Sequence, residues 1–203
     1  MIEIDITKQI KTYRGVLELH IKTTFESLCI TRIVGPSGVG KTTLLRILAG
    51  LIIPEKGLIK VDGKVWFDAD SKYSMAPQER QVGFVFQDYA LFPNMTVEQQ
   101  LRFGTEDLAY IDRLLAIGQM ESFKESLPKH LSGGQQQRLA ILRAMSTKPK
   151  VLLMDEPFSA LDYALKSQMI LDLQLLFKEQ ATTVLLVTHA QDEIAESKVF
   201  ELK

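Results

Sequence analysis

One segment near the N-terminus has the residue types and spacing of a phosphate-binding loop. Gly35 to Thr43 reads Gly-Pro-Ser-Gly-Val-Gly-Lys-Thr-Thr, which fits G-x-x-x-x-G-K-[ST] in full. The glycines allow a concave backbone whose N–H groups point at phosphate oxygens, and the helix expected next adds the positive end of its dipole. We expect Lys41 to contact the β- and γ-phosphates, Thr42 to bind Mg²⁺ and Thr43 to reach the α-phosphate. The predicted nucleotide-binding residues of this loop are Gly35, Pro36, Ser37, Gly38, Val39, Gly40, Lys41, Thr42 and Thr43.

Two acids at the end of a later strand supply a second chemical signal. Val151 to Met154 is a continuous apolar run, typical of a strand buried on both faces, and Asp155 and Glu156 follow it directly. Ligands of open α/β sheets bind at the carboxyl ends of the strands. There Asp155 would hold Mg²⁺ through a coordinated water, and Glu156 would activate the attacking water as general base. An acidic pair at a strand end is ordinarily a solvated turn, but the upstream loop favours catalysis.

The hydrophobic pattern around these motifs predicts an α/β fold of one domain. Buried apolar strands alternate with helices, which indicates a mainly parallel sheet, and antiparallel-looking N-terminal strands would lie to one side. The expected strands are 2–6, 16–21, 28–34, 58–61, 65–67, 82–86, 151–154, 183–187 and 199–202, and the expected helices are 41–49, 135–145, 164–178 and 190–196. A helical region from about 96 to 129 lies between them. We therefore expect a P-loop NTPase core with an N-terminal antiparallel β-subdomain and a small inserted α-helical subdomain.

Composition narrows the possible partners. The chain has 203 residues, a net charge of −1, 46% hydrophobic residues and a single cysteine, Cys29. A nucleic-acid binder usually carries a basic surplus, which this chain lacks, and one cysteine cannot form a disulfide within the chain. The N-terminus has no apolar core of a signal peptide, and the longest apolar runs are too short to cross a bilayer. We expect no nucleic acid and no direct lipid insertion, so any membrane role would require a partner.

A further segment carries the resemblance to a known family. Leu131 to Arg138 reads Leu-Ser-Gly-Gly-Gln-Gln-Gln-Arg and resembles the signature of ABC-type ATPase subunits, and nearly the whole chain is similar to them. Other markers of that family appear in the expected order. They are Tyr13 as the adenine-stacking aromatic, Gln87 of the Q-loop, Ser159 to Asp162 as the D-loop, and His189 as the switch histidine. The resemblance implies ATP as substrate and Mg²⁺ as cofactor.

The signature also implies a second copy of the chain. Ser132, Gly133 and Gly134 come just before a helix and would form a second anion-binding N-terminus. Two phosphate-binding surfaces would be redundant on one nucleotide. In the family, the signature of one subunit closes over the ATP held by the P-loop of the other, in a head-to-tail dimer. The residues expected to contact ATP in this way are Ser132, Gly133, Gly134, Gln135 and Asp162. In the same family Gln87 senses Mg²⁺ and the γ-phosphate, and His189 holds Glu156 and the lytic water. The expected catalytic residues are therefore Glu156, His189, Gln87 and Lys41. The expected metal-binding residues are Thr42, Gln87 and Asp155.

The residues after Gln87 resemble importer ATPases. In that family the stretch from Gln87 to Val97 grips the transmembrane permease, which implies a peripheral position on the cytoplasmic face of the bacterial inner membrane. The short helical segment and residues 62–68 are most similar to molybdate-type importers, with sulfate, iron and polyamine importers as competitors. The chain departs from the family pattern at two positions. Ala190 stands where an Asp often follows the switch histidine, and Gln100 replaces an Asn often seen after the Q-loop. The sequence also stops at Lys203, so we expect no C-terminal regulatory domain. The chain would then be either truncated or a minimal version of such an ATPase.

We therefore expect one ABC ATPase domain over 1–203, with 1–87 and 146–203 as core plus β-subdomain and about 88–145 as helical subdomain. Two other classes remain as alternatives. A soluble ABC ATPase of DNA repair or translation would usually carry coiled-coil insertions, zinc modules or a second cassette, none of which the sequence contains. A P-loop kinase or a binding-only module would leave the signature without a purpose.

Overall fold

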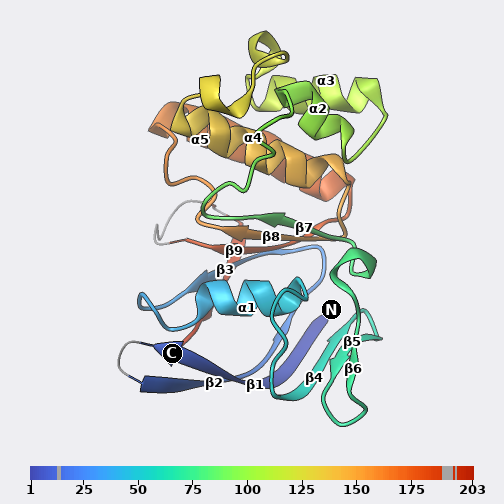
Figure 1. Cartoon of the computed structure of the whole chain (residues 1–203), viewed down its shortest axis with the longest axis vertical. Coiled ribbons are helices and arrows are strands. Elements are labelled where there is room, and N and C mark those ends of the chain that lie inside the picture. The colour runs from blue at the N-terminus through green and yellow to red at the C-terminus, as the bar shows by residue number, and fades with distance from the viewer. Residues whose placement is uncertain (13–14, 189–193, 195) are drawn as a thin grey trace.

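Two sheets organise the chain in the computed structural model, which describes residues 1–12, 15–188, 194 and 196–203 (Figure 1). The first is parallel and has the strand order β10-β3-β9-β8-β7. Its strands are β3 (Ile30–Val34), β7 (Val82–Val85), β8 (Val151–Asp155), β9 (Thr183–Val187) and β10 (Ser197–Glu201). The predicted buried strands are confirmed, because every residue of β8 and β9 is buried.

The second sheet is antiparallel and has the order β2-β1-β4-β5-β6. Its strands are β1 (Ile2–Thr12), β2 (Gly15–Phe25), β4 (Lys56–Val61), β5 (Lys64–Asp68) and β6 (Tyr73–Ser74). β1 and β2 pair along their whole length, so both are longer than the short alternating runs that predicted them. Cross-strand pairing extends a hairpin beyond the residues that alternate clearly in the sequence.

Helix α1 (Lys41–Leu48) lies between the two sheets (Figure 1). Leu44, Leu45, Ile47 and Leu48 are almost fully buried. They belong to one hydrophobic cluster that also contains Ile33 and residues of β1, β2, β4, β5, β8 and β9. Burial of these apolar side chains fixes α1, and with it the loop before α1, against the parallel sheet.

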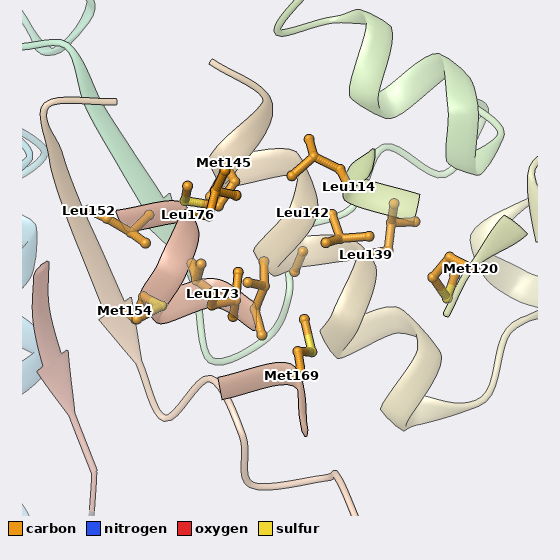
Figure 2. Packing of buried hydrophobic residues seen from close by; sticks show 14 of the residues in the cluster. Leu114, Met120, Leu139, Leu142, Met145, Leu152, Met154, Met169, Leu173 and Leu176 are labelled. Carbon is orange, nitrogen blue, oxygen red and sulfur yellow. The ribbon is translucent and has the colours of Figure 1, made fainter. Parts of the chain in front are cut away.

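Helices α4 (Gly133–Ser146) and α5 (Tyr163–Glu179) cover the opposite face of the parallel sheet (Figure 1). Helices α2 (Val97–Arg102) and α3 (Leu108–Ile117) pack on these two helices as an outer layer. Short 3₁₀ helices occur at Pro77–Glu79, Glu121–Phe123 and Pro128–His130. Figure 2 shows how the buried side chains of α3, α4 and α5 meet those of β8. The labelled members are Leu114, Met120, Leu139, Leu142, Met145, Leu152, Met154, Met169, Leu173 and Leu176.

The predicted fold class is therefore confirmed: the core is α/β, with a parallel sheet, an antiparallel N-terminal sheet and helices α2, α3 and α4 inserted between β7 and β8. These inserted helices share one hydrophobic cluster with α5, so their core is continuous with that of the sheet. The division at 88 and 145 stays a prediction. The helix expected at 190–196 lies largely outside the described residues.

Candidate functional site

A pocket lies where β1, the loop before α1 and the carboxyl ends of the parallel strands meet. Its volume is about 470 Å³. The lining residues are Ile10, Ser37, Gly38, Gly40, Lys41, Thr42, Thr43, Gln87, Glu156 and Val187. The structure thus brings together the predicted phosphate loop, the predicted general base and the predicted Q-loop glutamine, which are far apart in the sequence.

The backbone of the loop explains its glycines. Gly38 and Gly40 have φ angles of 80° and 107°, in the left-handed region that side chains disfavour. At Gly40, a β-carbon would also lie 2.9 Å from a methyl carbon of Leu19 on β2. Gly40 is the N-cap of α1 and has no side chain to satisfy the first N–H groups of the helix. Those groups are therefore available to an anion.

Lys41 is held at the mouth of this loop. Its side chain is only 6% exposed, and its Nζ donates hydrogen bonds to the carbonyl oxygens of Gly35 (2.7 Å) and Pro36 (2.9 Å). A buried ammonium is costly unless oxygen atoms surround it. The carbonyl groups satisfy that need without neutralising the charge, so Lys41 presents a net positive charge to a phosphate.

Asp155 and Thr42 form the candidate magnesium site. Asp155 ends β8 and is 3% exposed. Burial raises the pKa of its carboxyl group above the ordinary value, while a hydrogen bond from the Thr42 side chain acts in the opposite direction. Mg²⁺ in nucleotide sites is usually held by one or two protein oxygens together with phosphates and water. A buried carboxylate beside a hydroxyl group, at the base of a phosphate loop, fits that requirement.

Glu156 has an unusual backbone conformation. Its φ angle is 51°, although it is not a glycine. Its N–H donates to the carbonyl oxygen of Val187 on the neighbouring strand β9, at 3.0 Å. Non-glycine residues in this region cost about 1–3 kcal/mol and cluster at functional sites. The turn directs the chain out of the sheet immediately after β8 and lets Glu156 line the pocket.

The signature segment begins α4 outside the lining of this pocket. Ser132 is the N-cap: its Oγ accepts from Gln135 N (3.3 Å), and its own N–H donates to Gln135 Oε1 (2.7 Å). This capping box leaves the N–H groups of the glycines that follow exposed in the first turn. Residues 132–135 are not among those that line the pocket around Lys41. Asp162 is likewise outside that lining; its Oδ1 accepts from Leu165 N (3.0 Å) as the N-cap of α5.

Gln87 is exposed at the edge of the pocket, and the segment after it is fixed by α2 and α4. Tyr89 and Ala90 have positive φ angles, and Arg143 of α4 donates to both of their carbonyl oxygens. Gln100, fully buried, binds the backbone N–H and carbonyl of Phe92. The residue that departs from the family pattern at position 100 therefore closes the loop that follows Gln87.

Tyr13 and His189 lie outside the described residues, so their predicted roles stay predictions, as do the other assigned roles. Sequence reasoning missed two residues. Ile10 lines the pocket, and nothing in the alternation of β1 separates it from ordinary core residues. Gln137 contacts the backbone of Glu156, and its place within the signature was the available signal.

The phosphate loop before α1, the acids at the end of β8 and the parallel sheet define a P-loop nucleoside triphosphatase. Residues 19–159 match the model of the family described as ABC transporter. The chain therefore belongs to the ABC transporter family, as an ATP-binding domain of that family. This membership confirms the predicted class of ATPase. Among the described residues, no helix combines the length and apolar character needed to cross a bilayer.

Relatives with curated names are importer subunits. The chain is 38% identical over 200 residues to the probable sulfate/thiosulfate import ATP-binding protein CysA of Chlorella vulgaris, covering 95% of this chain and 81% of that protein. It is 38% identical over 196 residues to the molybdenum import ATP-binding protein ModC of Haemophilus ducreyi, covering 96% of this chain and 55% of that protein. The chain thus spans only about half the length of several relatives that it matches.

A solved structure is similar over the whole chain. It is the dimeric post-hydrolysis state of the ATP-binding cassette MJ0796 bound to ADP and Pi. The TM-score is 0.82 at 30% identity, and the match covers 100% of this chain and 94% of that one.

Proposed function

We propose that this chain is the ATP-hydrolysing subunit of a bacterial importer and works as a head-to-tail pair on the cytoplasmic face of the inner membrane. The observation that carries the proposal is the shared pocket of Lys41, Thr42, Gln87 and Glu156. It combines groups that bind phosphate with a carboxylate able to take a proton from water. A soluble ABC ATPase is less favoured, because the relatives are named import subunits.

In this proposal each residue has a defined task. The loop N–H groups and Lys41 bind and orient the phosphates. Glu156 accepts the proton of the attacking water, which Gln87 and His189 orient. Thr42 and Asp155 would hold Mg²⁺, which supplies charge neutralisation on the phosphate oxygens. Tyr13 would stack on the adenine.

The separation of the two anion-binding helix starts supports the pairing. Lys41 begins α1 and lines the pocket, whereas Ser132 caps α4 outside that lining. In the proposed dimer, Ser132, Gly133, Gly134, Gln135 and Asp162 of one chain complete the site of the other. The similar cassette is described as dimeric, which favours the same arrangement here.

The transported solute is proposed to be a small oxyanion, molybdate or sulfate, because the named relatives import these two. The permease would contact residues 87–97, where Leu91, Phe92 and Met95 are partly exposed. Uptake of labelled sulfate and of molybdate by the native host, with and without Glu156→Gln in the chromosome, tests this. If Glu156→Gln lowers neither the uptake of sulfate nor the uptake of molybdate, the oxyanion assignment is wrong.

The hydrolytic role is tested directly with Glu156→Gln in the purified chain. We expect loss of phosphate release by roughly two or more orders of magnitude, since the general base is removed. We also expect an ATP-bound dimer in size-exclusion chromatography. Normal hydrolysis by this variant would show that Glu156 is not the general base.

A further inference from the structure

One buried side chain connects the signature helix to the loop that carries Glu156. Gln137 lies on the second turn of α4 and is 1% exposed. Its Nε2 donates to the carbonyl oxygen of Glu156 (3.2 Å) and to Ser159 Oγ (3.1 Å). Its Oε1 accepts from the backbone N–H of Ala160 (2.9 Å). All three partners belong to the segment between β8 and α5, so one amide spans that segment.

The backbone of Glu156 needs such support. Its φ of 51° is a disfavoured conformation, which persists only when the surroundings fix it. Hydrogen bonds hold it on both sides: the N–H donates to Val187 O, and the carbonyl accepts from Gln137. Rotation of this residue toward an ordinary conformation would turn its carboxylate away from the pocket. Ser159 Oγ also donates to this carbonyl, at 3.2 Å, but Ser159 is itself bound by Gln137.

The first turn of α4 touches the same segment through its backbone. A β-carbon on Gly134 would lie 3.0 Å from the carbonyl oxygen of Ala160, so the two main chains are almost in contact. Ser132, Gly134 and Gln137 belong to one helical start, which the capping box makes rigid. A displacement of the signature is therefore carried to Gln137 without an intervening flexible element.

We propose that Gln137 is a positioning residue that holds Glu156 in its catalytic conformation and makes that conformation depend on the signature of the same chain. The inference rests on the proposed role of Glu156 as general base. In a head-to-tail pair, the signature of one chain faces the nucleotide of the other chain. Gln137 then ties the alignment of each chain's general base to the position of its own signature, which faces the partner's site.

Two substitutions separate the contributions of the amide. Gln137→Leu keeps the volume and removes every hydrogen bond. Gln137→Glu keeps an oxygen that accepts from Ala160 N but, while ionised, lacks the donor for Glu156 O. We expect both to lower kcat for ATP by roughly ten- to a hundredfold, the range that misplacement of a catalytic group produces. The KM for ATP should stay within about threefold, because the phosphate loop is unchanged.

The pH profile gives a readout that a packing defect would not move. The carboxyl group introduced by Gln137→Glu can donate a hydrogen bond when it is protonated. We therefore expect the kcat of Gln137→Glu, relative to the parent chain, to rise as the pH falls. The relative kcat of Gln137→Leu should stay low throughout, because its side chain cannot donate at any pH.

Gln180→Leu serves as the matched control. Gln180 also contributes an amide to the interior, where its Nε2 donates to the Tyr110 hydroxyl group (2.8 Å), but it lies at the end of α5 and outside the pocket. We expect this variant to lose stability with an unchanged kcat. An equal fall in kcat for Gln180→Leu and Gln137→Leu, or a kcat within twofold of the parent for Gln137→Leu, would overturn the inference. Loss of hydrolysis in Glu156→Gln alongside a normal Gln137→Leu would leave the proposed function standing and remove only this coupling.

Discussion

The ammonium of Lys41 lies 2.7 Å from the carbonyl oxygen of Gly35, the residue that begins the same loop. The same ammonium donates a second hydrogen bond to the carbonyl oxygen of Pro36, at 2.9 Å. The loop therefore folds around the charge of Lys41 and keeps that charge buried and unneutralised, ready for a phosphate.

Removing this charge should strongly weaken nucleotide binding with little effect on the fold. We expect Lys41→Ala to weaken ATP binding by roughly a hundredfold, because charge-assisted hydrogen bonds contribute about 1.5–3 kcal/mol each. A fluorescent-nucleotide titration measures the affinity. Lys64→Ala, which removes an exposed lysine of β5, should bind normally. Unchanged affinity in Lys41→Ala would contradict the assignment of the phosphate loop.

The candidate magnesium site can be tested by removing its charge. Asp155→Asn keeps the size of the buried side chain and loses the carboxylate. We expect ATP to bind without Mg²⁺ as before, while half-maximal hydrolysis requires roughly ten- to a hundredfold more Mg²⁺, the usual effect of losing a supporting ligand. Hydrolysis rates across a Mg²⁺ series provide the measurement. Asp172→Asn, which changes a half-buried carboxylate of α5 outside the pocket, is the control. An identical Mg²⁺ dependence in both variants would argue against the site.

A bulky charge at the signature should separate binding from hydrolysis. Ser132 is exposed, and Ser132→Arg places a long side chain where the second chain would approach. We expect the monomer to bind ATP with normal affinity and hydrolysis to fall more than about tenfold, since the partner site cannot close. Glu121→Arg adds an arginine at an exposed position of the 3₁₀ helix Glu121–Phe123 and should leave both properties unchanged. Weak ATP binding by the Ser132→Arg monomer would be inconsistent with a head-to-tail site.

Arg80 braces the far end of the phosphate-loop helix. It is 3% exposed, and its NH1 donates to the carbonyl oxygens of Ile47 and Leu48 at 2.9 Å each, at the end of α1. Burial lowers the pKa of its guanidinium group, and among the described residues its hydrogen-bond partners are carbonyl and hydroxyl oxygens. We expect Arg80→Met to cost roughly 2–4 kcal/mol of unfolding free energy, because several buried carbonyl groups lose their donor.

Urea unfolding monitored by circular dichroism measures this cost. Arg102→Met breaks an exposed pair with Glu98 on α2 and should change stability by less than about 1 kcal/mol. Equal midpoints for Arg80→Met and Arg102→Met would mean that the guanidinium group of Arg80 is not needed at the end of α1.

Local patterns were sufficient for several features. The apolar run from Val151 to Met154 predicts a strand buried on both faces, because such burial needs apolar residues. The glycines of the loop before α1 are explained by its positive φ angles, which favour glycine. Nothing in the sequence predicts β6, because a strand of two residues shows no alternation of apolar and polar side chains. Helix α4 begins at Gly133, two residues before the predicted start at Gln135, because Ser132 caps a turn whose glycines are by themselves poor helix formers.

The sequence by itself determined which residues are candidates for phosphate binding and which family the chain resembles, because those properties depend on residue types at fixed short spacings. Only the tertiary structure decided that Gln87 and Glu156 reach the pocket of Lys41 and that Ser132 does not line it. It also decided that the amide of Gln137 joins α4 to Glu156. Such relationships depend on how the parallel strands order themselves and on which helices cover them. Long-range burial sets that order, and no local spacing records it.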